Sequence, residues 1–220
     1  MSEKMLVTQA LDERDLLVKK ISDKIAKGNF VDSIKPNEEK VYSKRIGKEE
    51  FIKEAEAEYQ QIMDLIERFQ KIDAAIVDSN AKTVITTSYG SFTVAGAISL
   101  RGRLRGAGSY DGDADFESKL QDKLKREYNE CVRICDMKNS QLQKTADDMR
   151  LSILGKDTKN RDDKPLGVVD AYVKENNVEL VDPLDVMKKV QMLEEKRNKL
   201  LTELDTQIKV SNATTFIEVN

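Results

Sequence analysis

The sequence lacks several residue types on which common activities depend. It has no histidine and no tryptophan, only two cysteines and three prolines among 220 residues, and aromatic residues make up 5%. Without histidine, the chain has neither the most frequent general base nor the most frequent metal ligand of proteins. This absence excludes Ser-His-Asp and Cys-His mechanisms, so any chemistry would have to use carboxylate, lysine or tyrosine groups.

Long apolar runs and an excess of one charge are also missing. No stretch approaches the roughly 18 consecutive apolar residues of a membrane-spanning helix, and the first ten residues carry Glu3 and Thr8 without the apolar core of a signal peptide. The 37 basic and 40 acidic residues leave a net charge of −3, which gives no general attraction to nucleic acid or to an anionic membrane. We therefore expect a cytoplasmic protein, or a virion protein if the chain is encoded by a phage.

The two cysteines, Cys131 and Cys135, lie four residues apart in a charged helical stretch. A zinc site needs about four ligands, and no histidine or further cysteine is present to complete one. A disulfide framework would need a different distribution of cysteines, so a reducing compartment is the simpler interpretation. We expect both residues to be buried as small apolar side chains, and we expect no metal and no cofactor.

Charged residues are abundant, at 35%, and the 39% of hydrophobic residues recur periodically, which is typical of long helices rather than of a disordered chain. We predict four long helices, at about residues 3–27, 48–79, 115–153 and 182–211. Their expected buried seams are Val7, Leu11, Val18, Ile21 and Ile25 in the first; Phe51, Ala55, Tyr59, Ile62, Ile66, Phe69, Ile72 and Ile76 in the second; Phe116, Leu120, Leu124, Cys131, Ile134, Cys135, Leu142, Met149 and Ile153 in the third; and Val186, Val190, Leu193, Leu200 or Leu201, Leu204 and Ile208 in the fourth.

The segments between these helices have other signals. Residues 83–93 are rich in β-forming residues around a Ser-Tyr-Gly turn, which predicts a short hairpin followed by a short helix from Val94 with Thr93 as its cap. Residues 168–173 and 178–181 could be strand or short helix. Asp182 followed by Pro183 is the clearest helix start in the chain.

An internal repeat is the most informative pattern. Seven residues recur with one offset of 132 residues and no gap: Asp73, Ile76, Ser79, Asn80, Ala81, Thr83 and Ile85 match Asp205, Ile208, Ser211, Asn212, Ala213, Thr215 and Ile217. Both copies lie at the end of a long helix and lead into a β-rich segment. Each half of the chain is therefore expected to end in the same way.

The repeat predicts a structural role for its polar residues. Asn tolerates the left-handed conformation that ends a helix and Ser can satisfy the exposed carbonyls, so we interpret Ser79, Asn80, Ser211 and Asn212 as helix caps. The two strands that follow are expected to pair with each other. A polar ligand site at the two Ser-Asn pairs is an alternative, although helix caps explain every residue involved.

The repeats and the opening segment Gln9–Leu16, with sequence Gln-Ala-Leu-Asp-Glu-Arg-Asp-Leu, resemble the septicolysin-like family of small bacterial helical proteins. The closing segments 204–208 and 212–217 are similar to the end of that family. The resemblance covers roughly residues 5–105 and 180–219, and residues 106–179 depart from it. It implies a helical bundle with a small β element and self-association, and its motifs are structural rather than catalytic.

Two charged clusters are candidate sites. Asp111, Asp113 and Asp115 resemble the opening of a calcium loop, but Phe116 stands where the loop needs glycine and Asp122 replaces its bidentate glutamate, so a loop that caps the next helix is the better interpretation. Arg101, Arg103 and Arg105 could grip phosphate or an acidic partner. Because aromatic residues are not interleaved with them, an exposed helix face or an intersubunit salt bridge is favoured over nucleic-acid binding.

The run of Thr, Ser, Gly and Val over residues 83–100 also has the composition of the hairpins that pore-forming toxins insert into membranes. Each arm has about five alternating residues, whereas a membrane-crossing strand needs roughly nine or more. A small hairpin that covers the end of the helices is therefore the preferred interpretation.

These patterns predict a mainly α protein, an antiparallel long-helix bundle of two helical hairpins with pseudo-twofold character and a small β-sheet. We expect a single domain, residues 1–220, with a first half at 1–105, a variable region at 106–181 and the end of the second half at 182–220. We expect a non-enzymatic structural or assembly protein that forms homo-oligomers, including as a component of a larger particle such as a phage virion. A membrane-active protein and a nucleic-acid-associated protein are the alternatives.

Overall fold

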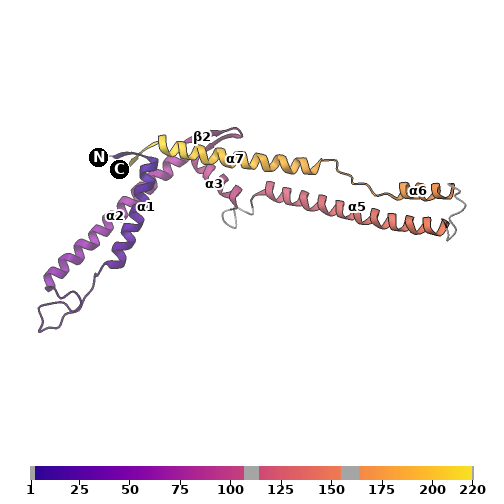
Figure 1. Cartoon of the computed structure of the whole chain (residues 1–220). Helices are drawn as coiled ribbons and strands as arrows, with labels where there is room; N and C mark the ends of the chain where they lie inside the picture. Colours follow the sequence, from indigo (N-terminus) through magenta and orange to yellow (C-terminus); the bar gives the residue numbers. More distant parts are fainter. Residues whose placement is uncertain (1–2, 107–113, 155–163, 220) are drawn as a thin grey trace. The chain divides into compact units, whose positions relative to one another are not determined.

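A computed structural model of the chain describes residues 3–106, 114–154 and 164–219, and the protein is mainly helical (Figure 1). The helices are α1 (Val7–Lys27), α2 (Lys48–Lys82), α3 (Val94–Arg105), α5 (Phe116–Leu154), α6 (Lys164–Asn176) and α7 (Val186–Thr214). The strands are β1 (Glu3–Leu6), β2 (Val84–Thr87), β3 (Gly90–Thr93) and β4 (Phe216–Val219). The predicted fold class, mainly α with a small β element, is confirmed.

The chain divides into two compact units, where the sequence led us to expect one domain. Unit 1 comprises Met1–Arg105 and Leu200–Asn220, and unit 2 comprises Gly106–Lys199. The second unit starts where we expected the variable region to start, but it extends well past the expected end at residue 181. The reason is that α7 is one continuous helix whose first part belongs to unit 2 and whose last part belongs to unit 1.

The N-terminal residues Glu3–Leu6 form strand β1, although we predicted them as the first turn of a helix. Helix α1 starts only at Val7, where the Gln9 side chain accepts a hydrogen bond from the backbone N–H of Leu6, 3.0 Å long. A glutamine three residues into a helix that accepts the preceding N–H is one arm of a capping box. The residues of β1 become a strand because β4, far away in sequence, supplies their backbone partners.

The predicted hairpin and the short helix after it are both confirmed. Strands β2 and β3 pair antiparallel, with Thr87 opposite Gly90 next to the two-residue turn. Gly90 has a backbone φ of +134°, a conformation that glycine adopts without strain. The Thr93 hydroxyl accepts a hydrogen bond from the N–H of Gly96, 3.1 Å long, and therefore caps α3 as predicted.

The strands form two separate two-stranded sheets, so the expected pairing between the two repeated strands is wrong. Strand β2 pairs with β3, while β4 pairs antiparallel with β1, so that Glu3 lies opposite Val219 and Met5 opposite Ile217. Each repeated strand therefore pairs with the strand that leads into a different helix. The two repeated strands, β2 and β4, therefore occupy equivalent positions in two different sheets and do not pair with each other.

Unit 1 has two buried apolar clusters, and each combines the two halves of the repeat. In the first, Ile72 and Ile76 of α2 pack with α1 and with Ile217 of β4. In the second, Leu204 and Ile208 of α7 pack with α3 and with Ile85 of β2. The strand that follows one long helix therefore covers the other helix pair, which is a pseudo-twofold exchange of strands within one chain.

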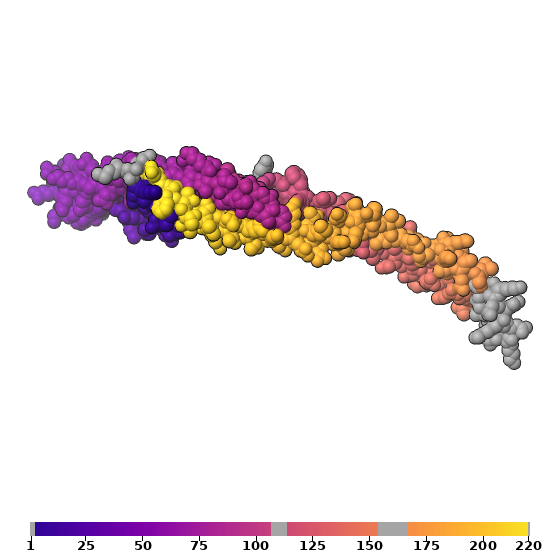
Figure 2. Space-filling view, turned by 90° about the horizontal axis from the view of Figure 1, so that it is seen from above, coloured from indigo at the N-terminus to yellow at the C-terminus, as the bar shows by residue number. Residues whose placement is uncertain are grey.

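Unit 2 is built around the long helix α5, along which α6 packs (Figure 2). The buried apolar side chains of these two helices are Leu142 and Ala146 on α5 and Val169 on α6. Further along α5, the Asn139 side chain bonds the backbone of Val178 twice, accepting from its N–H and donating to its carbonyl, each at 2.8 Å. Residues 168–173, left open between strand and helix, are helical.

The seam predicted for α5 is only partly correct. Leu142 is buried, but Phe116, Leu120 and Ile153 are exposed, and Gln121 is buried in their place. Helix α7 also starts later than predicted, at Val186 rather than Pro183. Asp182 nevertheless caps it, because its carboxylate accepts the N–H of Val186 at 2.9 Å across a turn in which Asp185 has a φ of +52°.

Candidate functional site

The arginine cluster on α3 is largely engaged within the chain. Arg101 Nη1 lies 3.3 Å from Asp205 Oδ1 of α7, and Arg105 Nη2 donates to Asp205 Oδ2. Arg103, on the same helix, has its Nε buried without a hydrogen-bond partner among the described residues. Two of the three guanidinium groups are therefore held by one carboxylate, which leaves less positive charge for an external phosphate.

The predicted cap residues do lie at equivalent helix ends, but the asparagines do not act as expected. Among the described residues, only Arg45 and Asp185 have positive φ outside glycine, so Asn80 and Asn212 are not left-handed. Both helices continue past them, to Lys82 and Thr214. The same last bond ends each helix: the N–H of Thr83 to the Ser79 carbonyl and the N–H of Thr215 to the Ser211 carbonyl, both 2.8 Å.

A second repeat, which the sequence analysis missed, completes the first. Four identities at an offset of 87 residues join β1–α1 to β3–α3: Val7 with Val94, Ala10 with Ala97, Arg14 with Arg101, and Leu17 with Leu104. The three apolar pairs are buried at both positions. The signal was present in the sequence as these four identities at one offset, with a helical spacing of three, four and three residues.

The two repeats meet in equivalent contacts. The Arg14–Asp73 ion pair, with 3.2 Å between Nη1 and Oδ1, corresponds to the Arg101–Asp205 pair. The backbone N–H of Val7 donates to the Thr215 carbonyl, and that of Val94 donates to the Thr83 carbonyl, both at 2.9 Å. The repeated arginines, aspartates and threonines therefore make equivalent contacts in the framework of unit 1.

The cysteines and the acidic loop do not form a metal site in the described part of the chain. Cys131 is exposed and Cys135 is half-buried, so the expectation that both are buried is wrong. Asp111 and Asp113 lie outside the described residues. Asp115 is buried, accepts the N–H of Ser118 at 3.1 Å, and lies 2.6 Å from Arg197 Nη1, which agrees with its interpretation as a helix cap. The described residues contain no group of three or more potential metal ligands.

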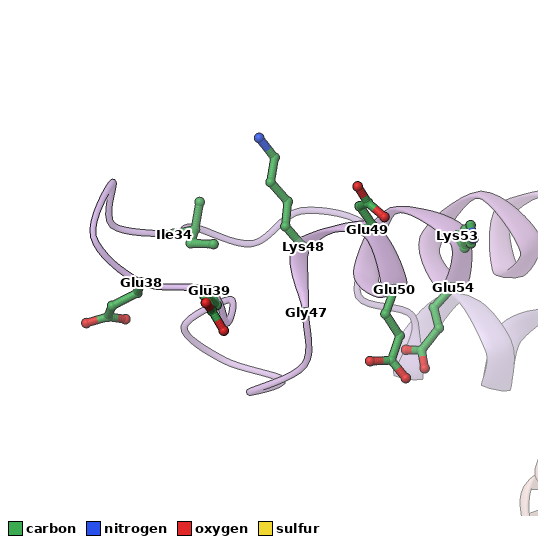
Figure 3. A pocket seen from close by; sticks show the side chains of 9 residues that line it. All are labelled: Ile34, Glu38, Glu39, Gly47, Lys48, Glu49, Glu50, Lys53 and Glu54. Carbon is green, nitrogen blue, oxygen red and sulfur yellow. The ribbon is translucent and has the colours of Figure 1, made fainter.

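An open depression lies where the loop between α1 and α2 meets the start of α2 (Figure 3). Its lining residues are Ile34, Glu38, Glu39, Gly47, Lys48, Glu49, Glu50, Lys53 and Glu54. Glu50 and Glu54 point to the same side in this view, whereas Glu49 and Glu38 point away from them (Figure 3). Because catalysis and ion binding both need several converging groups, the glutamates of this depression do not have the geometry of such a site.

The same loop is organised by one carboxylate, that of Asp32. It accepts hydrogen bonds from the backbone N–H groups of Ser33, Ser43 and Lys44 and from the Ser43 hydroxyl, at 2.8 to 3.2 Å. Desolvation alone would raise the pKa of Asp32, but these hydrogen bonds together lower it below its ordinary value of 3.8. The charged form of Asp32 therefore ties the two ends of the loop together.

Large apolar side chains are exposed on both helices of the α1/α2 pair. We call this surface the apolar α1/α2 face; its residues are Val18, Ile25, Ile52, Tyr59, Met63 and Val77. Several of them, such as Tyr59 at 57% exposure, are more than half accessible to solvent. Val18, Ile25 and Tyr59 were predicted to be in the buried seams but are exposed; Leu17, which was not in the predicted seam, is buried against α2, while Ile62 is buried as predicted.

Unit 2 also exposes large apolar side chains. On α5, Phe116 is 73% exposed and Leu151 is 69% exposed, and on α6 Val168 is 70% exposed. In both units, then, a helix has a single helical neighbour along much of its length but carries more apolar positions than that neighbour covers. Exposed apolar surface of this kind is typical of protein–protein contacts.

Comparison of the chain with models of protein families, with curated proteins and with solved structures finds no significant match. Among the described residues, no helix combines the length and the apolar character needed to cross a membrane.

Proposed function

We propose that this chain is a non-enzymatic structural protein that assembles with further copies of itself, alone or as a component of a larger particle such as a phage virion. The observation that carries the proposal is the exposed apolar surface on long helix pairs, above all the apolar α1/α2 face. Soluble monomers rarely leave a large contiguous apolar patch in water, because its burial is favourable by roughly 25 cal/mol per Å².

The architecture of each unit supports this proposal. A pair of antiparallel helices can bury one stripe of each helix, and the rest of the apolar surface needs a further layer. In unit 1, the strand exchange supplies such a layer only near the Ile76 and Ile208 ends of the long helices. Over the remaining length of α1 and α2, no further helix or strand of the described part of unit 1 adds such a layer.

The function of a nucleic-acid-associated protein is less well supported. It depended on Arg101, Arg103 and Arg105, and the ion pairs of Arg101 and Arg105 with Asp205 neutralise part of their charge. Phosphate binding would have to displace this carboxylate, which is only 30% exposed. The near balance of acidic and basic residues adds no compensating attraction.

A membrane-active function is also less well supported. Strands β2 and β3 have four residues each, compared with about nine to eleven in a membrane-crossing strand. The turn between them is anchored to α7, because the Glu203 carboxylate accepts hydrogen bonds from the backbone N–H and the hydroxyl of Ser88, both at 2.7 Å. Insertion would have to break this anchor.

Sedimentation equilibrium of the full chain over a wide concentration range tests the proposal. We expect a mass that rises towards at least twice that of the chain as concentration increases, in a reaction that dilution reverses. The proposal fails if the chain sediments as a monomer at every concentration up to about 1 mM, since a contact weaker than about −4 kcal/mol could not support an assembly.

A further inference from the structure

Most of the exposed apolar residues of α1 and α2 lie directly after a buried residue or seven residues after such a position. Val18 directly follows the buried Leu17, Met63 follows the buried Ile62, and Val77 follows the buried Ile76. Ile52 follows the buried Phe51 in the same way. One residue along an α-helix corresponds to a rotation of about 100°, so each of these side chains lies a quarter-turn forward from the contact between the helices.

This forward rotation places all of them on one face of the pair. The two helices are both right-handed but run antiparallel, so a forward step from the contact turns towards the same side of the pair in each helix. Tyr59 lies seven residues after Ile52 and Ile25 seven after Val18, close to two full turns, so they belong to the same side. Leu16, which precedes Leu17, lies on the opposite side.

Two ion pairs between the helices agree with this assignment. Asp73 follows the buried Ile72, so it belongs to the apolar side, where it pairs with Arg14 at 3.2 Å. Arg68 precedes Phe69 and belongs to the opposite side, where it pairs with Glu13 at 2.8 Å and with Glu3 at 2.7 Å. The opposite side is therefore charged, and the apolar side has one charged group at one end, in which Arg14 pairs with Asp73 and also lies 3.7 Å from Asp15.

The size of the apolar α1/α2 face suits a specific contact. Helix α1 has 21 residues and so lies beside α2 for roughly 31 Å at about 1.5 Å per residue, and two helices about 9 Å apart present a width of about 18 Å. The product, on the order of 550 Å², approaches the roughly 600 Å² per partner at the lower end of standard protein interfaces. The face is therefore large enough to hold two folded chains together.

The chemistry of the face favours a copy of itself as the occupant. The charges on the face are confined to Arg14, Asp73 and Asp15 at one end and sum to no more than one negative charge, so the face has little electrostatic preference for a strongly basic or acidic partner. A surface of two antiparallel helices fits an identical surface, since two such pairs form a four-helix bundle. A contact between identical patches related by a twofold axis is also self-complementary by construction.

We propose that the apolar α1/α2 face binds the same face of a second copy, so that two chains form an intermolecular four-helix bundle. The proposal rests on the self-association proposed above and names the surface that produces it. Val18, Tyr59 and Met63 lie inside this contact, and Leu16 stays in solvent.

Substitution of two neighbouring residues tests the surface. Val18→Lys puts a charge into the proposed contact, whereas Leu16→Lys puts the same charge on the opposite side of α1; the two side chains are 48% and 64% exposed, so neither is needed for the core. Because the change occurs twice in a twofold contact, Val18→Lys should raise the dimer dissociation constant at least about 100-fold. Leu16→Lys should change it less than about threefold.

The outcomes separate this inference from the proposed function. If the unsubstituted chain self-associates and Val18→Lys does so with equal affinity, the surface is wrong although self-association stands. The same conclusion follows if Leu16→Lys dissociates the dimer as strongly as Val18→Lys. If the unsubstituted chain is a monomer, both proposals fail.

A cross-linking measurement avoids any effect of a buried charge on folding. Replacement of Tyr59 by the photoreactive p-benzoylphenylalanine keeps an aromatic ring at a position that is already 57% exposed. Irradiation should give a covalent dimer with this variant and none with the same group at Leu16. A covalent dimer from the Leu16 position alone would overturn the proposal.

Discussion

At the scale of single residues, unit 1 depends on two acidic side chains in equivalent places. Asp205 holds both Arg101 and Arg105, while Asp73 of the other half holds Arg14. The two carboxylates have the same role at the ends of equivalent helices. They differ in the number of guanidinium groups that depend on them: Asp205 holds two, whereas Asp73 holds only Arg14, which also lies 3.7 Å from Asp15.

This difference predicts unequal effects of the same substitution. Asp205→Asn should lower the free energy of unfolding by about 1–2 kcal/mol, and Asp73→Asn by about 0.5–1 kcal/mol, because charge-assisted bonds at partly exposed positions are worth that much. Urea unfolding of the two variants measures both values. Equal losses would show that the second arginine contributes nothing.

The Asp32 carboxylate predicts a pH dependence. Its pKa is lowered in the folded chain, so its stabilising contribution is complete above the ordinary value of 3.8 and is lost as the pH falls through the lower folded value. The difference in unfolding free energy between the natural chain and Asp32→Asn should therefore be constant from pH 7 to about pH 5 and shrink below pH 4. A difference that grows on acidification would contradict this assignment.

At the scale of helices and strands, local patterns predicted most of what the structure shows. The hairpin of β2 and β3, the Thr93 cap and the extent of α2 follow from residues close together in sequence. Strand β1 could not be predicted in this way, because Glu3–Leu6 have no local signal and acquire their partners from β4. Pairing partners depend on the path of the whole chain.

The seam of α1 was also beyond reach, for a different reason. Leu16, Leu17 and Val18 are consecutive apolar residues, so the sequence fits three adjacent stripes equally well. Leu17 is the buried one because it lies seven residues, about two helical turns, after the fully buried Ala10, where α2 packs closely against α1. Of the candidate site residues, the arginines were found by their charge, but their partner Asp205 is about 100 residues away and nothing local points to it.

The close approach at the start of α1 and α3 can be tested directly. Ala10 and Ala97 are equivalent in the second repeat and both are fully buried. Ala10→Leu and Ala97→Leu should each destabilise the chain by about 1–3 kcal/mol through overpacking. Ala26→Leu, at an exposed position of α1, is the control and should change stability by less than about 0.5 kcal/mol. A large effect at only one of the two buried alanines would contradict their equivalence.

At the scale of the whole molecule, unit 1 contains the same strand–helix and helix–strand segments twice. The turn at Ser88–Tyr89 joins β2 to β3, and at the equivalent place Glu3 lies directly opposite Val219. A short link between Val219 and Glu3 would have the same geometry as the natural turn between Thr87 and Gly90. The chain could therefore be closed between Val219 and Glu3 and opened between Ser88 and Tyr89 without a change in the fold of unit 1.

A circular permutant tests this equivalence. We expect a chain that links Val219 to Glu3 through a short Asn-Gly turn, and that starts at Tyr89 and ends at Ser88, to fold with helical content equal to that of the natural chain. The permutant should lose some stability, because the anchor of Ser88 to Glu203 then holds a free end. Circular dichroism and thermal unfolding measure both properties. Failure to fold would show that the two places are not equivalent.

The proposed role of the protein depends most directly on self-association through helix faces that are exposed in a single chain. The mass of the full-length protein in solution, measured by light scattering after size separation from about 1 µM to about 1 mM, is the decisive measurement. We expect a dimer or larger closed oligomer that forms as concentration rises. A single species with the mass of one chain across that range would contradict it.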